Sequence, residues 1–198
     1  MKRLFLFSLS FSIIAFFMIL FFARETFLYN AALHCAILSL ALFLIWKDDL
    51  GSTLASIGFP GEIKRNILFI GGGFMAIIAF AMVLNLASMV LKFNDQAKVS
   101  EKIGDLPLYV LVLAVVGAPI TEELLFRAAL VPRFGIIAPA LAFGIVHLAY
   151  GSVVEVVGVA AIGLILGFVY QKSKSITPCI VIHLVYNLLS IIAMRMLT

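Results

Sequence analysis

The feature that most constrains the fold of this chain is its series of long apolar runs. A helix needs about 20 predominantly apolar residues to cross the hydrocarbon core of a bilayer. We therefore predict an all-α protein, a polytopic membrane bundle of about seven transmembrane helices. The seven runs, of which the fifth and sixth are short, are Leu4–Ala23, Phe27–Trp46, Ile67–Leu91, Leu106–Val131, Phe134–Tyr150, Val153–Tyr170 and Ile176–Leu197.

The composition supports a membrane protein rather than a soluble domain with a large core. Of the 198 residues, 64% are hydrophobic and 12% are charged, whereas a soluble domain has about half apolar and about a quarter charged residues. We interpret the net charge of +4 as a feature of membrane topology rather than of nucleic-acid binding, because no basic run is interleaved with aromatic residues. We expect membrane lipid as a partner, and no nucleic acid.

Two polar segments, 47–65 and 92–105, separate the runs. The first holds Gly51, Gly58, Pro60 and Gly61, which predict a loop with an interfacial turn. No internal repeat or linker divides the chain, so we predict a single integral membrane domain, 1–198, with a motif-bearing core at about 106–197. The first run is long for a signal core and has no clear A-x-A cleavage site, so we interpret it as an uncleaved span.

The distribution of Lys and Arg predicts a cytoplasmic N-terminus. With seven spans and the N-terminus inside, the outer flanks hold Arg24, Lys92, Lys98, Lys102 and Arg195. The cytoplasmic flanks hold the larger set: Lys2, Arg3, Lys47, Lys64, Arg65, Arg133, Lys172 and Lys174.

The two cysteines, Cys35 and Cys179, both fall in apolar runs. This placement does not suit a disulfide frame or a metal-binding cluster. We predict that both are buried free thiols.

The segment PITEELLFRAAL, residues 119–130, places three ionisable groups inside an apolar run. Glu123 and Arg127 are four residues apart, so they share one face of a helix and can pair. Glu122 points to a neighbouring face. Two interpretations stay open at this point: a structural ion pair with Glu122 as a second anchor, or a functional site in which Glu122 is a general base or acid.

Two histidines each lie four residues, about one helical turn, from another aromatic or polar residue. FGIVH places Phe143 and His147 on one helix face, and HLVYN does the same for His183 and Asn187. Together with Glu122 and Glu123, these side chains can satisfy one another only by converging on a polar cavity inside the bundle. Such a set can hydrolyse a substrate or hold a metal.

Two further polar residues in apolar runs receive no functional role. His34 stands alone in the second run, and a lone histidine is more often a hydrogen-bonded packing residue. Asn85 stands alone in the third run, where we expect an interhelical hydrogen bond.

The three motifs together resemble those of the CPBP family, which includes the CAAX-processing type II endopeptidases and the bacteriocin-processing or bacteriocin-immunity proteins, often called the Abi family. EELLFR matches the family's EExxxR motif, FGIVH its FxxxH motif and HLVYN its HxxxN/B motif, in order and on successive late helices. The match covers residues 119–187, and residues 55–65 look like the family's variable segment before the core.

This resemblance implies a glutamate-dependent intramembrane endopeptidase with six catalytic residues: Glu122, Glu123, Arg127, His147, His183 and Asn187. It implies that Glu122 activates the attacking water, and that Glu123 and Arg127 maintain the charge distribution of the site. It further implies that His147 positions water or metal, and that His183 and Asn187 bind the water or the tetrahedral oxyanion. The family's helices form a conical bundle around a cavity that opens toward the cytosolic leaflet.

Two residues of the motif region have predicted effects on the helices themselves. Pro119 removes a backbone donor shortly before Glu122 and predicts a kink at the site. Gly144, beside Phe143, predicts a close approach of two helices.

Two alternatives stay open for the cofactor: a divalent metal or none. The zinc protease signature HExxH is absent, but Glu122, His147 and His183 could supply three ligands to zinc or another divalent metal and leave a fourth position for water. The family carries the label metalloprotease. Equally, Glu122 could activate water without a metal, helped by histidine and asparagine side chains.

Two other classes of function are weighed against the protease. A proton-coupled transporter would show paired repeats or helices broken by Gly and Pro in corresponding halves, and the sequence has neither. A non-catalytic immunity or scaffold protein would not need the complete polar set. The substrate stays open between a CAAX-type prenylated protein and a small membrane or leader peptide.

Overall fold

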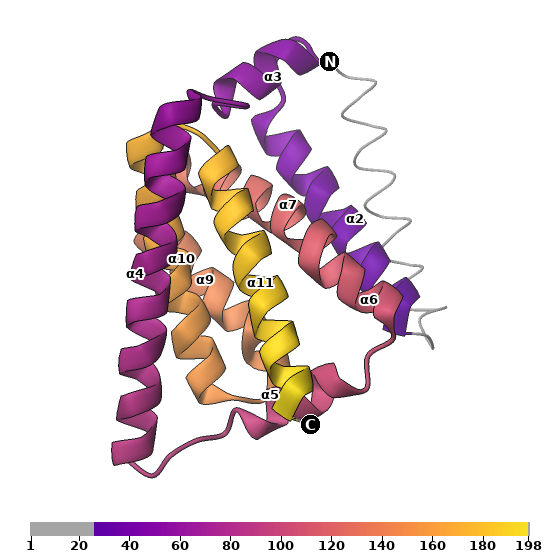
Figure 1. Cartoon of the computed structure of the whole chain (residues 1–198). Coiled ribbons are helices and arrows are strands. Elements are labelled where there is room, and N and C mark those ends of the chain that lie inside the picture. The colour runs from indigo at the N-terminus through magenta and orange to yellow at the C-terminus, as the bar shows by residue number, and fades with distance from the viewer. Residues whose placement is uncertain (1–25, 198) are drawn as a thin grey trace.

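The computed structural model describes residues 26–197, and these form a bundle of helices (Figure 1). The predicted first span, with its uncleaved N-terminus, lies outside the described residues. The elements in chain order are α2 (Thr26–Ile45), α3 (Leu50–Ser56), α4 (Ile63–Val90), α5 (Ala97–Gly104), α6 (Leu108–Val112), η1 (Leu113–Gly117), α7 (Ala118–Glu123), η2 (Leu124–Leu130), α8 (Val131–Phe134), α9 (Ile137–Val146), η3 (His147–Tyr150), α10 (Val153–Ser173) and α11 (Thr177–Leu197).

Five helices in the described part of the chain are long and apolar enough to cross a membrane. A shorter apolar helix, Ile137–Tyr150, corresponds to the fifth predicted run. The prediction of a polytopic helical membrane bundle is therefore confirmed. The sixth run is longer than predicted, because Gln171 and Lys172 continue α10 by one turn to Ser173.

The outer surface of the bundle is apolar, as a lipid-facing surface must be. Long helix α4 exposes large side chains along its length, among them Leu68, Met75 and Met82. In water such a face would be an aggregation site. In a bilayer it contacts acyl chains, while the helical backbone satisfies its own hydrogen bonds.

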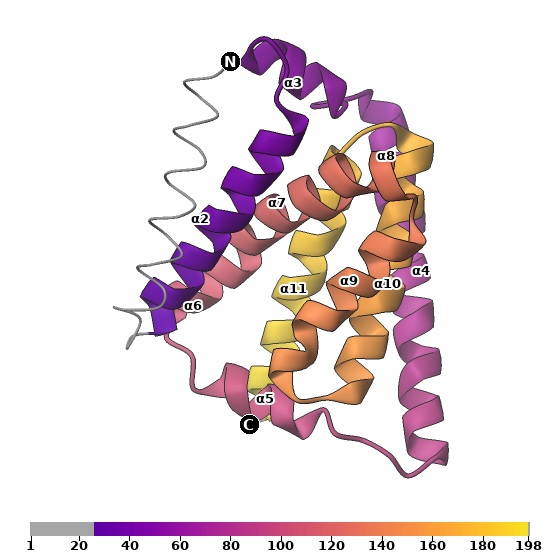
Figure 2. The ribbon, with the colours of Figure 1, turned by 180° about the vertical axis from the view of Figure 1, so that it is seen from behind.

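Helix α11 lies at the centre of the bundle and contacts the helices on both sides (Figures 1 and 2). On one side α4 and α10 pack together, and α9 packs on α10. On the other side α2 packs against α7 and η2. Short helices close the two ends, with α3 at one end and α5 at the other. The polar residues of α11 therefore meet those of α7 in the interior.

Gly144 and Gly58 each allow a close approach of backbones. A Cβ at Gly144 would lie 2.8 Å from the Ala160 Cβ and 2.9 Å from the Val156 carbonyl oxygen, so α9 and α10 are in close contact, as predicted. Gly58 has a φ of +71°, and a Cβ there would collide with the Lys174 carbonyl. This glycine lets the loop after α3 dock on the α10–α11 loop, where the Ile176 amide donates to the Ile57 carbonyl.

Two prolines fall within the long helical segment from Leu108 to Phe134, and each follows a π-helical stretch. A proline has no amide hydrogen, and its ring clashes with the carbonyl four residues earlier. η1 ends shortly before Pro119 and η2 shortly before Pro132. The π-turn moves hydrogen bonds to i→i+5 spacing, so the helix continues past each ring. We predicted a kink at Pro119, and the structure has a π-helical stretch directly before it.

Two predictions about isolated residues are wrong. Asn85 is exposed, and its amide donates to the Ala81 carbonyl of the same helix at 3.1 Å, so its bond is not interhelical. Cys35 is exposed, whereas Cys179 is buried as predicted. A position in an apolar run does not imply burial in the protein, because lipid covers the outward faces of a membrane helix.

The N-terminus of α10 is held by Asp95 from the loop between α4 and α5. The carboxylate accepts hydrogen bonds from the Ser152 hydroxyl at 2.6 Å and the Val153 amide at 2.7 Å. The Ser152 hydroxyl in turn accepts from the Glu155 amide. These acceptors satisfy amides that a helix N-terminus leaves without partners. The Ser152 hydroxyl, the Val153 and Val154 amides and the charge of Lys98 hold the pKa of Asp95 below its usual value.

We expect this cap to make stability depend on pH. A carboxyl group whose pKa is lowered by folding stabilises the native state above its unfolded pKa of about 3.9, and this contribution disappears as the pH falls through the lower folded value. Asp95→Asn should therefore lower the melting temperature at neutral pH and flatten its dependence on pH below about 4. Thermal unfolding in detergent measures both. Glu101→Gln, at an exposed acid of α5, is the matched control and should behave like the unaltered protein.

Candidate active site

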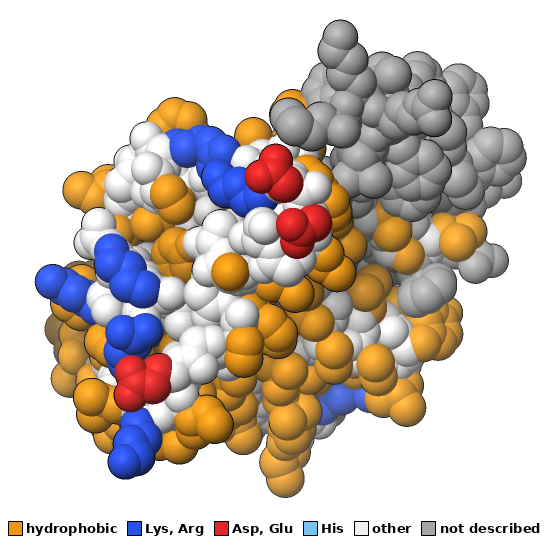
Figure 3. All heavy atoms as spheres, turned by 90° about the horizontal axis from the view of Figure 1, so that it is seen from above, with side chains coloured by type: hydrophobic (Ala, Val, Ile, Leu, Met, Phe, Trp, Pro, Cys, Tyr) orange, Lys and Arg blue, Asp and Glu red, His pale blue; other side chains and the backbone are white. Residues whose placement is uncertain are grey.

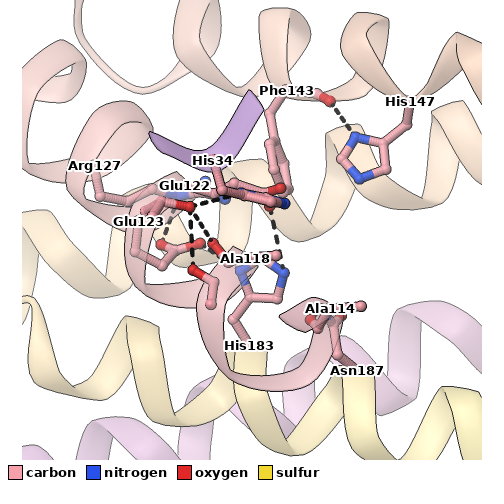
Figure 4. A network of polar contacts seen from close by, with 12 residues as sticks. His34, Ala114, Ala118, Glu122, Glu123, Arg127, Phe143, His147, His183 and Asn187 are labelled. Carbon is pink, nitrogen blue, oxygen red and sulfur yellow. Dashed lines mark hydrogen bonds and ion pairs between the residues drawn. The ribbon is translucent and has the colours of Figure 1, made fainter. Parts of the chain in front are cut away.

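The predicted polar residues come together from three parts of the chain (Figure 4). Glu122 and Glu123 end α7, and Arg127 lies in η2 one turn later. His147 follows α9, and His183 and Asn187 lie on α11. The structure thus brings all six candidate residues into one region in the interior of the bundle.

Arg127 and Glu123 form a fully buried ion pair. Arg127 Nε lies 3.0 Å from Glu123 Oε2, and the two residues are 1% and 0% exposed. Within the described residues, neither terminal nitrogen of the Arg127 guanidinium has a hydrogen-bond partner. The guanidinium carbon instead lies 4.5 Å from the centroid of the Phe143 ring, a cation–π arrangement. The motif spacing thus predicted the pair, and Phe143 completes the surroundings of the cation.

His183 lies between the two carboxylates. Its Nδ1 is 2.8 Å from Glu123 Oε1, and its Nε2 is 3.8 Å from Glu122 Oε2. Glu123 pairs with the Arg127 guanidinium as a carboxylate, which can only accept, so Nδ1 carries the hydrogen. In a neutral ring Nε2 is then an acceptor, and it faces Glu122. The gap at Glu122 is too long for a direct hydrogen bond but suits one water molecule that contacts both groups.

A cavity of about 160 Å³ contains Glu122, His147, His183 and Asn187 in its wall. Glu123 and Arg127 lie behind this wall and do not line it. The two members of the EE pair therefore differ in position: Glu122 faces the cavity, whereas Glu123 is buried against Arg127 and His183. Glu122 is the carboxylate that a substrate or water molecule can reach.

Asn187 is held by a carbonyl that the π-turn leaves without a helical donor. In an α-helix the Ala114 carbonyl would accept from the Ala118 amide, but that amide donates to Leu113. The next residue, Pro119, has no amide hydrogen. The Asn187 side-chain amide donates to Ala114 instead, at 3.0 Å. One of its two amide hydrogens is thus committed to the backbone, and the other is available to a ligand.

His147 faces the same cavity from the opposite side. Its Nδ1 lies 2.8 Å from the Phe143 carbonyl, which can only accept, so Nδ1 carries the hydrogen and Nε2 is an acceptor in the neutral ring. The Phe143 ring packs against both histidines, with centroid distances of 4.9 Å to His147 and 5.8 Å to His183. Phe143 therefore fixes the positions of both imidazoles and of the Arg127 guanidinium.

Several residues to which the sequence gave no functional role also line this cavity. From α2 come Asn30 and His34, and from the other side come Tyr150, Glu155 and Tyr186. His34 Nδ1 lies 2.8 Å from the hydroxyl oxygen of Thr121, the residue before Glu122. The only sequence signal for His34 was a polar side chain in an apolar run, which is also the signal for a packing residue.

The hydrogen bond between His34 and Thr121 ties α2 to the helix that carries Glu122. We expect His34→Leu to lower the free energy of unfolding by about 0.5–1.5 kcal/mol, the usual net contribution of one hydrogen bond. Asn85→Leu is the control: its exposed side chain bonds only within its own helix, and its substitution should leave the melting temperature unchanged. Equal loss in the two variants would contradict a specific interhelical bond at His34.

Residues 104–189 match the family model described as type II CAAX prenyl endopeptidase, Rce1-like. The predicted family resemblance is confirmed. The matched residues include all three motifs and the π-turn before Pro119. No curated protein and no solved structure matches the chain. The matching description names neither the Abi proteins nor a metalloprotease, so these two parts of the prediction gain no support.

The donor set of the cavity does not fit the predicted three-ligand metal site. Among the residues that the structure describes, no three His, Cys, Asp or Glu side chains converge closely enough to hold a metal ion. The Nδ1 atoms of His147 and His183 are held by the Phe143 carbonyl and by Glu123, so each imidazole could offer a metal only its Nε2 atom. Because the donors do not converge, the proposed reaction uses protein groups and water only.

Proposed function

We propose that this protein is an intramembrane endopeptidase of the type II CAAX kind in which Glu122 activates the attacking water. The observation that supports this proposal best is the position of His183, which is oriented by Glu123 and presents Nε2 toward Glu122 across 3.8 Å. A carboxylate that orients a histidine next to the reacting group is a recurrent arrangement in hydrolytic enzymes.

In the proposed reaction, a water molecule lies between Glu122 and His183 Nε2. Glu122 takes one proton of the water, and Nε2 accepts a hydrogen bond from the other. The oxygen then attacks the carbonyl carbon of the scissile peptide bond. The free amide hydrogen of Asn187 donates to the oxyanion of the tetrahedral intermediate. The proton held by Glu122 passes to the leaving nitrogen, and the C–N bond breaks to give a carboxylic acid and an amine.

Each buried partner has a supporting role in this proposal. Arg127 pairs with the Glu123 carboxylate, and Glu123 keeps the hydrogen of His183 on Nδ1, so that Nε2 stays an acceptor toward the water. His147, on the opposite wall, is available to hold the substrate or a second water molecule. The division between a buried carboxylate and a cavity carboxylate explains why the motif requires two acids.

The test is peptide cleavage in proteoliposomes. Two substrates should be compared: a prenylated peptide with a CAAX terminus, and an unmodified transmembrane peptide. An endopeptidase releases a cleaved product from at least one of them. A proton-coupled transporter would move protons without releasing a fragment, and a scaffold or immunity protein would do neither.

The metal question has its own measurement. The mechanism derived from Glu122, His183 and Asn187 needs no metal, so we expect cleavage to persist after dialysis against a strong chelator and the purified protein to contain no stoichiometric zinc. Loss of activity on chelation that is restored by added zinc would instead support the predicted ligands Glu122, His147 and His183. A chelator-treated zinc protease of known metal content is the positive control.

The position of the cavity makes two of the topology predictions alternatives to each other. The cavity lies in the half of the bundle near α5, since its wall includes Ile103 and Leu106 at that end and extends inward to Glu122. A cytoplasmic N-terminus with seven spans instead puts the α3 end in the cytoplasm. Exposed basic residues do gather on the α3 face (Figure 3), namely Lys47, Lys64, Arg65, Arg133, Lys172 and Lys174.

Single cysteines introduced at Ser56 and at Glu101, in a background lacking Cys35 and Cys179, decide the orientation. A reagent that does not cross membranes labels only the outer one in intact cells. Labelling at Ser56 supports a cavity that opens to the cytosolic side, as the family resemblance implies. Labelling at Glu101 supports the cytoplasmic N-terminus that the charge distribution predicts.

A further inference from the structure

The cavity holds a second carboxylate that the proposed mechanism does not use. Glu155 lies in the first turn of α10 and lines the same cavity as Glu122. Its backbone amide bonds to the Ser152 hydroxyl. Among the described residues, no hydrogen bond or ion pair reaches its side-chain carboxylate. The side chain is half-buried. Its carboxyl group is therefore neither fully exposed to solvent nor paired with a positive charge among the described residues.

The position of Glu155 relates it to the proposed catalytic carboxylate. Glu122, Glu155 and Tyr150 all line the main cavity. Glu155 also borders a smaller adjoining cavity of about 60 Å³, together with Val159 and Tyr186. Glu155 therefore lies at the boundary between the main cavity and the smaller cavity beside α4.

The wall of the main cavity offers these acids no basic partner. Among the described residues that line it, none is Lys or Arg. The two basic side chains of α5 are already bonded: Lys98 donates to the Gly151 carbonyl and Lys102 to the Ala149 carbonyl. Apart from the two acids, the ionisable side chains of the wall are His34, His147, His183, Tyr150 and Tyr186. With neutral imidazoles, the wall carries two carboxyl groups and no positive charge.

An ionisable residue within a membrane span is retained where it faces water or a partner of opposite charge. We propose that Glu155 is a specificity-determining residue that binds a positively charged Lys or Arg side chain of the substrate peptide while the scissile bond lies at Glu122. This inference rests on the proposed endopeptidase function and adds to it a substrate class: peptides with a basic residue close to the cleaved bond.

The proposal predicts an order of preference. At one position near the scissile bond, a peptide with Lys binds more tightly than the same peptide with Gln, and the peptide with Glu binds most weakly. A hydrogen bond to a charged group changes affinity by about 10- to 100-fold. The Lys peptide should therefore exceed the Gln peptide by at least about tenfold. Glu155→Gln should remove this preference and leave the affinity for the Gln peptide unchanged.

The experiment separates binding from cleavage. The probes are the prenylated CAAX peptide and the unmodified transmembrane peptide, each made with Lys, Gln or Glu at successive positions on both sides of the bond. Dissociation constants are measured for Glu122→Gln protein in proteoliposomes, with Glu155 unaltered or replaced by Gln or by Asp. Cleavage of the same peptides by protein with Glu122 intact is measured in parallel. Glu101→Gln controls for the loss of one negative charge elsewhere.

The outcomes are distinct. The expected result is a Lys preference that Glu155→Gln abolishes, that Glu155→Asp retains at least in part, and that Glu101→Gln leaves unchanged. The same ranking of peptides with and without Glu155 overturns the proposal, as does a Glu155→Gln protein that loses affinity for all peptides equally. Absence of cleavage by the unaltered protein, with the charge preference present in binding, overturns the endopeptidase function but not the role of Glu155. Absence of binding by every peptide overturns the assigned substrate class.

Discussion

Glu122→Gln protein should fold like the unaltered protein and lose nearly all peptide cleavage. Glutamine has almost the shape of glutamate but cannot take the proton of the attacking water. General base catalysis contributes about 10²–10⁴-fold to rate, so we expect kcat to fall by about that factor while substrate affinity stays within about threefold. Initial rates of peptide cleavage in proteoliposomes measure the first quantity, and binding to the variant measures the second.

The control variants separate this effect from a general disturbance of the site. Glu101→Gln removes a carboxylate from the exposed surface of α5 and should leave kcat unchanged. Asn187→Ala removes the proposed oxyanion donor and should lower kcat by about 10²–10³-fold. If Glu122→Gln protein cleaves at the unaltered rate, Glu122 is not the base, and the acidic pair is a structural feature.

Arg127→Ala should cause the largest loss of stability among single substitutions at the site. The guanidinium is 1% exposed and pairs with Glu123, which is 0% exposed. Its removal leaves a buried carboxylate beside a vacated volume. Breaking a buried pair in this way costs about 3–5 kcal/mol. Unfolding in a denaturing detergent, followed by circular dichroism, should show a corresponding shift of the transition.

Two further proteins test the cause of this loss. Arg65→Ala, on the exposed first turn of α4, should change stability by no more than about 0.5 kcal/mol. The double variant Glu123→Gln/Arg127→Ala no longer buries an unpaired charge, so it should be more stable than Arg127→Ala alone. A double variant that is less stable by the sum of the single losses would contradict a direct interaction between the two side chains.

The sequence predicted those features of the site that depend on spacing within one helix. Glu123 and Arg127 pair across four residues, although η2 makes this stretch π-helical rather than α-helical. Phe143 and His147 also contact each other across four residues, through the Phe143 carbonyl and the ring. Neighbours at this spacing lie on one face whatever the rest of the fold does.

Features that depend on docking between helices could not be read in the same way. The contact of His34 with Thr121 spans 87 positions of sequence, and it depends on how α2 packs on α7. The bond from Asn187 to the Ala114 carbonyl depends on the π-turn before Pro119. Pro119 itself was the available signal: a proline within a helix leaves carbonyls without donors, and a polar side chain from a neighbouring helix can supply one.

The apolar composition did not indicate which side chains of the helices are exposed. In a soluble domain an apolar run marks the core, but in this bundle the same run supplies both the interior and the lipid-facing surface. Cys35 and Asn85 lie outward for this reason, whereas Cys179 and His183 lie inward. The interior face of a membrane helix can be recognised from sequence only when polar residues on different helices form one predicted site, as Glu122, His183 and Asn187 do.

The most direct test of water activation by Glu122 is mass spectrometry of the products formed in proteoliposomes in heavy-oxygen water. The proposed mechanism predicts two peptide fragments, with one heavy oxygen atom in the new carboxyl terminus, formed by the unaltered protein and reduced to near background by Glu122→Gln. Fragments that form equally with both proteins, or no fragments from either test peptide, would contradict water activation by Glu122.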